Sequence, residues 1–181
     1  MQSRNVIRAV ALIAVAAAAA AASAPVSAQS TATRHLTVVT SSTTEASAAS
    51  GTRVALVLEV APKPTMHVYA PGQKDYIPVS LVLTPQTSVT AAAVRFPPAE
   101  KLTLKDLGET QLVYSKPFRI VQNVTIAPRA RGGRTADITI KGTLKYQACD
   151  DSICYAPVSV PVAWTVAPPD RASAGGKSPS R

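Results

Sequence analysis

Short runs in which hydrophobic and polar residues alternate make up most of the chain after its first quarter. In the clearest run, residues 136–146, apolar residues and one glycine take the even positions, while Thr, Asp and Lys take the odd positions. Because successive side chains of a strand point to opposite faces, this pattern predicts a strand with one buried and one solvent-exposed face. Residues 158–166 repeat the pattern, with four valines and Trp164 on one parity. Pro161, on the other parity, predicts an edge strand or a bulge because proline donates no ladder hydrogen bond.

Five further segments have the length and composition of short strands. They are residues 54–60, 66–69, 77–83, 94–96 and 117–127, and prolines follow most of them. No segment outside the alanine-rich N-terminus has the 3.6-residue period of a helix. About seven short strands, with turn signals at intervals of about 8–12 residues, are typical of an immunoglobulin-like sandwich. The sequence therefore predicts an all-β, immunoglobulin-like β-sandwich over residues 53–166.

The first 28 residues have the three parts of a secretory signal peptide. Arg4 and Arg8 form the positive segment, residues 10–22 form the apolar segment, and Val26-Ser27-Ala28 is a small-x-small cleavage site. The apolar segment is too short and too rich in alanine to make a good membrane-spanning helix, which disfavours an uncleaved anchor. Residues 1–28 are therefore predicted to direct export to the bacterial periplasm.

Two other segments are predicted to lie outside the folded domain. Residues 29–52 are rich in Ser, Thr and Ala and predict a flexible leader, apart from a strand-like patch at residues 35–39. Residues 167–181 are rich in Ser, Gly and Lys and predict a disordered tail.

The chain is basic, with 19 Lys and Arg, ten Asp and Glu, and a formal net charge of +9. The basic residues are scattered, and only Arg129, Arg131 and Arg134 come close together, beside a Gly-Gly turn. Few aromatic residues could stack on bases, so nucleic acid is not predicted as a partner. No second apolar run is long enough to span a membrane, so no transmembrane segment is predicted in the mature chain.

The two cysteines, Cys149 and Cys154, lie in the loop between the two clearest strands. In an exported protein two cysteines are expected to pair. The bond would close a loop of about six residues, which chain-entropy reasoning credits with roughly 2 kcal/mol, less than a long loop would give. This placement favours a reversible disulfide presented at one end of the sandwich. The alternative is a bond that stiffens the loop and never cycles. With only His35 and His67 as histidines, no metal site or cofactor is predicted.

Asp150 and Asp151 follow directly after Cys149. Negative charge raises the pKa of a nearby thiol, so this pair would be a slow attacker at neutral pH. Its disulfide is better suited to attack by the low-pKa thiolate of a partner. The sequence thus favours an electron relay over a strong catalyst, and it leaves open whether the chain is an enzyme in its own right.

The segment Tyr146-Gln147-Ala148-Cys149, followed after four residues by Cys154-Tyr155-Ala156-Pro157, resembles the redox loop of the N-terminal periplasmic domain of the thiol:disulfide interchange protein DsbD. Upstream of this loop, Met66-His67-Val68-Tyr69, Phe96-Pro97-Pro98 and residues 108–114 occur in the family's order. The resemblance covers residues 53–166. It implies an immunoglobulin-like domain whose two cysteines form a cycling disulfide.

The resemblance also implies partners and residue roles. Cys154 would form the mixed disulfide with a partner, Cys149 would resolve it, and Tyr69 would pack near the pair. The implied partners are thioredoxin-like periplasmic proteins, including disulfide isomerases and the thioredoxins of cytochrome c maturation. A separate DsbD-like membrane protein is a further candidate partner. Apart from the resemblance, Tyr146 and Tyr155 are predicted to wall the loop, and Leu107 is a candidate cap residue. His67 is either a residue that tunes the thiols or a half-buried strand histidine, and Glu109 is either an aid to proton transfer or an exposed loop charge.

The sequence departs from the family's pattern in three ways. Its loop between the cysteines is one residue shorter than in the best-known members. Its cap segment, residues 105–109, contains no aromatic residue, which leaves Leu107 as a smaller lid. The membrane and thioredoxin-like domains are missing from the sequence, so a stand-alone first domain is expected. The alternative function is a non-catalytic, exported binding or adhesion sandwich with a structural disulfide.

Overall fold

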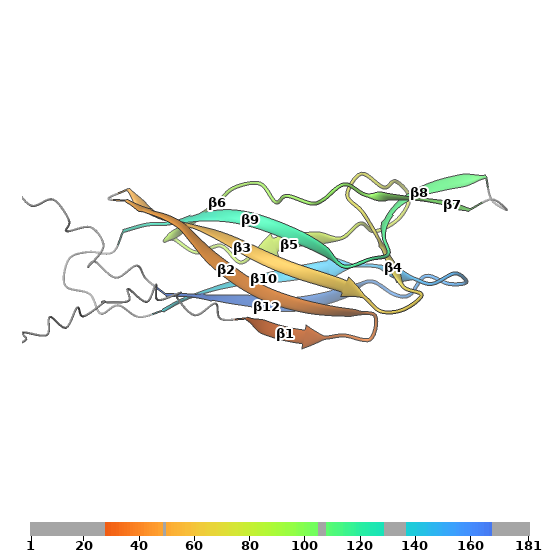
Figure 1. Cartoon of the computed structure of the whole chain (residues 1–181), viewed down its shortest axis with the longest axis horizontal. Helices are drawn as coiled ribbons and strands as arrows, with labels where there is room; N and C mark the ends of the chain where they lie inside the picture. The colour runs from red at the N-terminus through yellow and green to blue at the C-terminus, as the bar shows by residue number, and fades with distance from the viewer. Residues whose placement is uncertain (1–27, 49, 105–107, 129–136, 168–181) are drawn as a thin grey trace, which may run out of the picture.

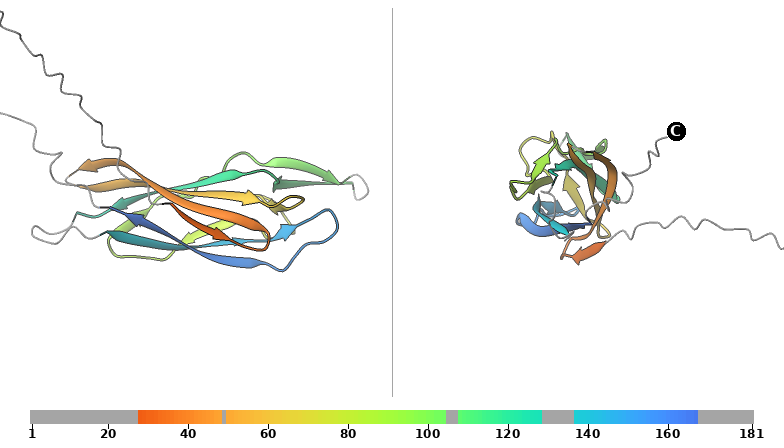
Figure 2. Two further views of the ribbon diagram at one scale, coloured as in Figure 1. Left: turned by 60° about the horizontal axis from the view of Figure 1, so that its bottom comes forward. Right: turned by 90° about the vertical axis from the view of Figure 1, so that its left-hand side faces the viewer.

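The fold is that of a computed structural model, which describes residues 28–48, 50–104, 108–128 and 137–167. In these ranges every regular element is a β-strand, which confirms the all-β prediction. Most of the longer strands run along the long axis of the molecule (Figures 1 and 2). In chain order the strands are β1 (Gln29–Ala32), β2 (Leu36–Ala48), β3 (Gly51–Pro62), β4 (His67–Tyr69), β5 (Ser80–Leu83), β6 (Val89–Ala91), β7 (Glu100–Leu104), β8 (Glu109–Tyr114), β9 (Phe118–Ile126), β10 (Ile138–Tyr146), β11 (Ala148–Cys149) and β12 (Val158–Val166).

The strands form three antiparallel sheets. The five-stranded sheet has the order β1-β2-β3-β9-β6, and the three-stranded sheet has the order β12-β10-β5. A four-stranded sheet, β11-β4-β8-β7, lies at one end of the molecule, on the right of Figure 1. The loop between β10 and β12 projects at the same end. We call this end, with the four-stranded sheet and that loop, the loop end.

The hydrophobic core lies between the five-stranded and three-stranded sheets. Along β9, β10 and β12, buried residues alternate with more exposed ones, as the sequence pattern predicts. They meet the buried face of β3, where Leu56 and Leu58 have no exposed surface. Trp164 of β12 is 1% exposed, and its Nε1 donates a 2.9 Å hydrogen bond to the carbonyl oxygen of Val57 in β3. This bond joins the two sheets and satisfies the polar group of the buried indole.

Residues 29–52, predicted to form a flexible leader, are part of the fold, so that prediction is wrong. β1 and β2 occupy most of the segment, and β2 pairs with β3 along nearly its whole length. Leu36 and Val38 of β2 are buried in the core. The Ser and Thr residues that suggested flexibility also suit a half-exposed strand, because threonine is β-branched. Pairing with β2 also covers an edge of β3 that would otherwise be open.

Six of the predicted strands are present, as β3, β4, β5, β9, β10 and β12. The strand predicted at residues 94–96 is reduced to one bridge between Arg95 and Val121, because two prolines follow it. The predicted signal peptide, Leu107 and the predicted tail lie almost wholly outside the described residues. Within the described ranges, no helix is long and apolar enough to cross a membrane.

Candidate redox site

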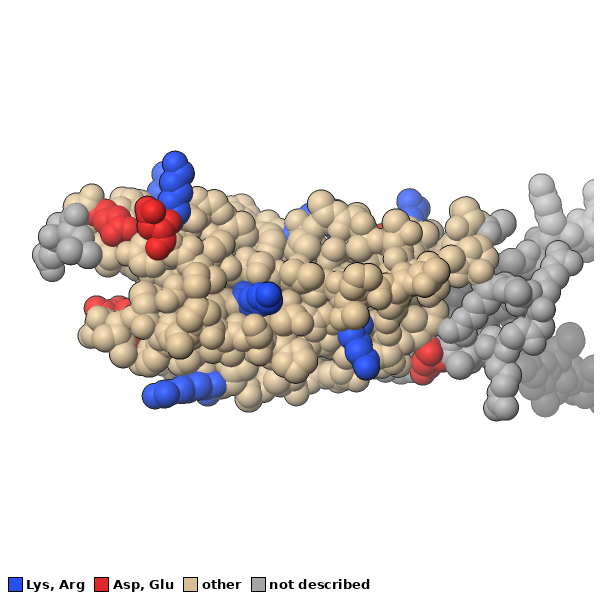
Figure 3. All heavy atoms as spheres, turned by 180° about the vertical axis from the view of Figure 1, so that it is seen from behind, with Lys and Arg blue, Asp and Glu red and all other residues tan. Residues whose placement is uncertain are grey.

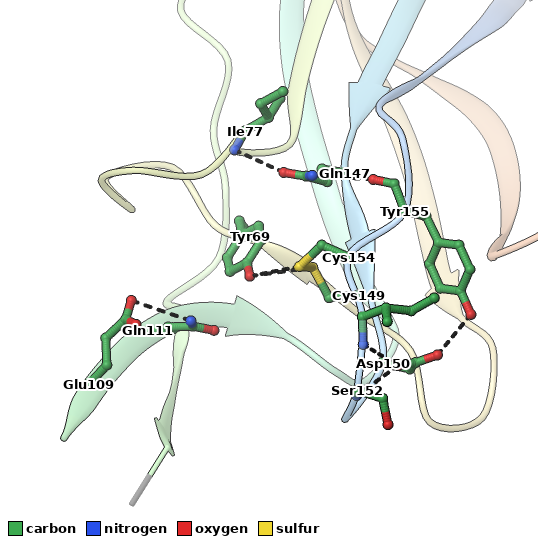
Figure 4. The surroundings of a disulfide bond; sticks show 11 residues. Tyr69, Ile77, Glu109, Gln111, Gln147, Cys149, Asp150, Ser152, Cys154 and Tyr155 are labelled. Atoms are coloured by element: carbon green, nitrogen blue, oxygen red, sulfur yellow. Dashed lines mark hydrogen bonds between the residues drawn. A yellow bond between two sulfur atoms is a disulfide. The ribbon is translucent and has the colours of Figure 1, made fainter. Parts of the chain in front are cut away.

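The two cysteines form a disulfide in the loop between β10 and β12 (Figure 4), as expected from the sequence. Cys149 belongs to β11, which pairs with β4 and places Cys149 opposite His67. Cys149 is only 2% exposed, whereas Cys154 is an exposed residue. One end of the bond is therefore shielded by the four-stranded sheet, and the other end is open to solvent.

A tight turn, Asp150 to Ile153, connects the two cysteines. The Asp150 N–H donates to the Ile153 carbonyl oxygen at 3.0 Å, and the Tyr155 N–H donates to the Ala148 carbonyl oxygen at 2.9 Å. Asp150 Oδ1 accepts hydrogen bonds from the backbone N–H groups of Ser152 and Ile153, both at 2.8 Å. An aspartate that binds backbone N–H groups two and three residues ahead is typical of a tight turn. The loop is thus a short hairpin with the disulfide across it.

Tyr69 lies against the disulfide. Its hydroxyl oxygen is 3.3 Å from Cys149 Sγ and 3.4 Å from Cys154 Sγ. Because disulfide sulfurs carry no hydrogen, the phenol is the donor in these contacts. The Tyr69 ring stacks on Tyr76, with 4.2 Å between the ring centroids. Burial, with smaller contributions from Tyr76 and Glu109, raises the pKa of Tyr69 to about 12, so the phenol keeps its proton at neutral pH.

His67 packs edge-on against the Tyr69 ring, with 5.8 Å between the ring centroids. Burial lowers the pKa of His67, and the two aspartates of the turn only partly offset this effect. The imidazole is therefore neutral at pH 7. Beside it lies a groove of about 240 Å³, whose lining includes Asp151 of the turn and Glu100 and Leu102 of β7.

Tyr155 lies on the opposite side of the loop from Tyr69 (Figure 4). Its hydroxyl donates a 2.7 Å hydrogen bond to Asp150 Oδ2. Its ring packs on His35 with 4.5 Å between the ring centroids, and the Arg34 guanidinium carbon lies 5.5 Å from the centroid of the same ring. The outer side of the redox loop is therefore in contact with the connection between β1 and β2.

Sequence reasoning missed Arg34 and His35 as neighbours of the loop, because both fall in the segment predicted to be a leader. The strand-like patch at residues 35–39 was the available signal. A strand at residues 35–39 must pair with a neighbouring strand of the sandwich. This pairing would place Arg34 and His35, at the start of the patch, against the folded domain.

Two of the predicted supporting residues lie farther from the disulfide. Tyr146, the last residue of β10, is buried in the sandwich core, and its hydroxyl shares a 2.8 Å hydrogen bond with Thr33 Oγ1. Glu109 begins β8 and accepts a 3.3 Å hydrogen bond from Gln111 Nε2. The structure brings four of the predicted site residues together at the disulfide: Cys149, Cys154, Tyr69 and His67.

Acidic side chains gather at the loop end, although the formal net charge of the chain is +9. Figure 3 shows Asp and Glu side chains at the end that carries β7 and β8, on its left. Hydrogen bonds from Ile153, Tyr155 and Ser152 lower the pKa of Asp150, so this carboxylate stays charged beside the cysteines. Such a charge raises the pKa of a nearby thiol.

The arrangement suits attack by an external thiolate on Cys154. Attack at the sulfur of this exposed residue would expel Cys149 as a thiolate, and the Tyr69 hydroxyl is placed to donate to that thiolate. In the part of the chain that the structure describes, no group of three or more His, Cys, Asp or Glu side chains could hold a metal ion.

A family model for the N-terminal domain of the thiol:disulfide interchange protein DsbD matches residues 35–163, which is more than half of the chain. The match begins inside the segment that was predicted to be a leader, in agreement with the position of β2 in the fold.

Solved structures also resemble the chain. The N-terminal periplasmic domain of ScsB from Proteus mirabilis is 13% identical, with a TM-score of 0.51, and the alignment covers 75% of this chain and 49% of that one. The chain thus spans about half the length of the ScsB chain. The N-terminal domain of DsbD from Neisseria meningitidis, in its reduced form, is 18% identical, with a TM-score of 0.36 over 68% of this chain and 82% of that one. The GAE domain of GGA2p from Saccharomyces cerevisiae is 8% identical, with a TM-score of 0.46 over 78% of this chain and 97% of that one.

A search of the curated proteins finds no match. The antiparallel sandwich and the family match together confirm the predicted immunoglobulin-like fold. With a match over residues 35–163, the chain belongs to the family of N-terminal domains of the thiol:disulfide interchange protein DsbD.

Proposed function

We propose that the chain is a thiol:disulfide exchange module that relays electrons through Cys149 and Cys154. The observation that carries this proposal is the unequal exposure of the two cysteines. Cys149 is 2% exposed, while Cys154 is open to solvent. A disulfide that only stabilised the fold would have no need of an accessible end, whereas exchange requires that a partner thiolate reach one sulfur.

Reduction of the module follows from this geometry. The thiolate of a partner dithiol attacks Cys154 Sγ, the Cys149–Cys154 bond breaks, and Cys149 leaves as a thiolate. The second thiolate of the partner then attacks the partner's own sulfur in the mixed disulfide and expels Cys154. The module gains two electrons and two protons, and the partner becomes a disulfide.

Delivery of electrons runs in the reverse order. The Cys154 thiolate attacks the disulfide of an oxidised partner, and Cys149 then attacks Cys154 Sγ and releases the reduced partner. Cys149 is therefore the resolving residue. The proposed partners are thioredoxin-like proteins of the periplasm, with a separate DsbD-like membrane protein as a source of electrons.

A pair of single-cysteine variants tests the proposal. The probe is a thioredoxin-like domain that keeps one cysteine, activated as its mixed disulfide with thionitrobenzoate. Cys149→Ala should displace thionitrobenzoate through Cys154 and form a stable protein–protein disulfide. Cys154→Ala, which keeps only the shielded cysteine, should react at least about tenfold more slowly.

Equal rates for the two variants would contradict the assignment of Cys154 as the contact residue. The wild-type disulfide should also be reduced by a dithiol thioredoxin-like domain. A reduction potential below about −300 mV would mark the bond as structural and would support an adhesion or binding sandwich instead.

A further inference from the structure

Asp150 joins both ends of the redox turn through its side chain. Oδ1 accepts from the N–H groups of Ser152 and Ile153, and Oδ2 accepts from the Tyr155 hydroxyl at 2.7 Å. Asp150 follows Cys149 and Tyr155 follows Cys154, so the last of these bonds links the residues that come directly after the two cysteines. None of the three hydrogen bonds involves a sulfur atom. All three can therefore persist when the disulfide is reduced.

The Tyr155 ring is held from outside the loop. It packs on the His35 ring at 4.5 Å and lies 5.5 Å from the Arg34 guanidinium carbon. A guanidinium at this distance from a ring centroid makes a cation–π contact. Both residues belong to the connection between β1 and β2, which is far from the redox loop in sequence.

This connection is itself fixed to the sandwich. Thr33 Oγ1 accepts a 2.9 Å hydrogen bond from the Leu36 N–H and shares a 2.8 Å hydrogen bond with the hydroxyl of the buried Tyr146. Leu36 has no exposed surface. The support on which Tyr155 rests is thus part of the rigid body of the fold and does not depend on the disulfide.

We infer that the Asp150–Tyr155 hydrogen bond, backed by Arg34 and His35, is a latch that holds the redox loop closed after the disulfide is reduced. This inference deepens the proposed function, on which it rests for its biological meaning. Tyr155 and Asp150 are positioning residues, since the hydrogen bonds of their side chains described above do not involve the sulfurs. Their effect is to keep the Cys154 thiol near Cys149.

The latch has a thermodynamic and a kinetic consequence. A loop that is already closed loses little conformational entropy when the two sulfurs bond, which favours the disulfide form. The same proximity raises the effective concentration of Cys149 at a mixed disulfide on Cys154, which speeds resolution. The hydrogen bonds that Asp150 accepts also lower its pKa, so the carboxylate stays charged at neutral pH and the latch persists there.

Tyr155→Phe is the variant that removes only the latching hydroxyl and keeps the ring on His35 and Arg34. The measurement is the redox equilibrium with dithiothreitol, which gives two electrons and two protons to Cys149 and Cys154 while its own thiols close to a disulfide. We expect the equilibrium to shift toward the dithiol by about threefold to tenfold, the effect of losing a hydrogen bond to a charged group near the surface. A second measurement starts from Cys154 in a mixed disulfide with thionitrobenzoate. Cys149 attacks Cys154 Sγ and releases thionitrobenzoate, and this release should slow by a similar factor.

Two further variants separate the latch from a general loss of structure. Tyr114→Phe removes another tyrosine hydroxyl bond of 2.7 Å, to the Pro97 carbonyl oxygen, and should leave the dithiothreitol equilibrium unchanged. Asp150→Asn keeps an oxygen for the backbone N–H groups but removes the charge. It should therefore shift the equilibrium in the same direction as Tyr155→Phe.

The latch is overturned if Tyr155→Phe and Asp150→Asn both titrate like the wild type, including the case in which all three stay oxidised. It is also overturned if Tyr114→Phe shifts the equilibrium as much as Tyr155→Phe does. Dithiothreitol needs no protein partner, so the test does not depend on the proposed function. Failure of the wild type to exchange with a thioredoxin-like domain would contradict that function and leave a shifted Tyr155→Phe equilibrium as evidence for the latch.

Discussion

The sandwich body and the loop end are built from different kinds of contact. Between the two larger sheets, apolar side chains such as Leu56, Leu58 and Ile120 have no exposed surface. At the loop end a small apolar cluster of Tyr69, Val113 and Cys149 is surrounded by phenols, imidazoles and carboxylates. Burial of apolar area is the dominant favourable term in folding, so most of the stability should come from the body.

The loop end has a different task, which is to hold a breakable bond in a defined place. Its contacts are hydrogen bonds and ring contacts, which individually contribute little to stability but set geometry. Stability and reactivity are therefore assigned to separate regions. A variant in the body should therefore change stability and leave the redox equilibrium of the disulfide nearly unaffected.

The largest expected effect is on the stability of the body. Trp164→Ala should lower the free energy of unfolding by about 3–5 kcal/mol, because it leaves a cavity beneath β3 and removes the Nε1 hydrogen bond to the Val57 carbonyl oxygen. Urea unfolding measures this loss. Trp164→Phe fills part of the cavity and should lose less.

The same variant tests whether the regions are separate. In the conditions where Trp164→Ala is folded, its dithiothreitol equilibrium should match that of the wild type. A large shift in that equilibrium would show that packing in the body controls the geometry of the loop.

Tyr69→Phe should slow the reduction of the disulfide. The hydroxyl donates to the sulfur that leaves when Cys154 is attacked, so its loss removes a hydrogen bond to a developing thiolate. We expect reduction by glutathione to slow by about threefold to tenfold. The ratio of the wild-type rate to the Tyr69→Phe rate should stay constant from about pH 6 to pH 9, because the pKa of Tyr69 is about 12 and its phenol stays protonated. Equal rates for Tyr69→Phe and the wild type would mean that the phenol only packs against the disulfide.

The pH dependence of stability should come from the loop end. The chain has two histidines, His35 and His67, and both lie there. Burial lowers the pKa of each below its usual value of 6.5. As the pH falls below about 6.5, the histidines of the unfolded chain take up protons before those of the folded chain do. The free energy of unfolding therefore decreases.

A double variant, His35→Phe with His67→Phe, isolates this contribution. It keeps two rings in place and should flatten the stability curve between about pH 5 and pH 7. A second decrease should remain below about pH 4, because hydrogen bonds lower the pKa values of Glu100 and Asp150. Urea midpoints across this range provide the measurement. A double variant that retains the slope between pH 5 and 7 would contradict the assignment to the histidines.

Sequence patterns predicted the parts of the fold in which one face of a strand is buried along its whole length. β10 and β12 are examples, since their alternation follows directly from a two-residue period. The redox loop was also predictable, because it contains the only two cysteines of a chain whose sequence predicts export.

The parts that sequence reasoning missed depend on pairing between distant segments. β7 and β11 are short and carry no strong pattern, and they become strands only because β8 and β4 lie beside them. The contact of Arg34 with Tyr155 likewise arises from the placement of β2 on β3. A local pattern cannot reveal such contacts, because β propensity depends on tertiary surroundings.

The smallest expected effect concerns the turn that leads into the redox site. Thr65 lies between β3 and β4 and has a φ of 68°, in the left-handed region that favours glycine. The turn is closed by a 3.0 Å hydrogen bond from the Met66 N–H to the Lys63 carbonyl oxygen. A β-branched residue in this conformation is strained by about 1–3 kcal/mol, while glycine adds about 0.5–1 kcal/mol of unfolded-state entropy. At the low end of this strain, the two effects leave a net gain, and Thr65→Gly should raise the free energy of unfolding by at most about 1 kcal/mol.

This turn belongs to the loop end by position but should act on stability alone. Thr65→Asn is the matched variant, because asparagine tolerates a positive φ without the extra freedom of glycine in the unfolded chain. Urea unfolding should rank both variants above the wild type, with no change in their dithiothreitol equilibria. If instead the equilibria shift, the strain at Thr65 sets the position of β4 and, through Tyr69, of the disulfide. The turn at Thr65, before His67, would then belong to the region that controls reactivity as well as to the region that controls stability.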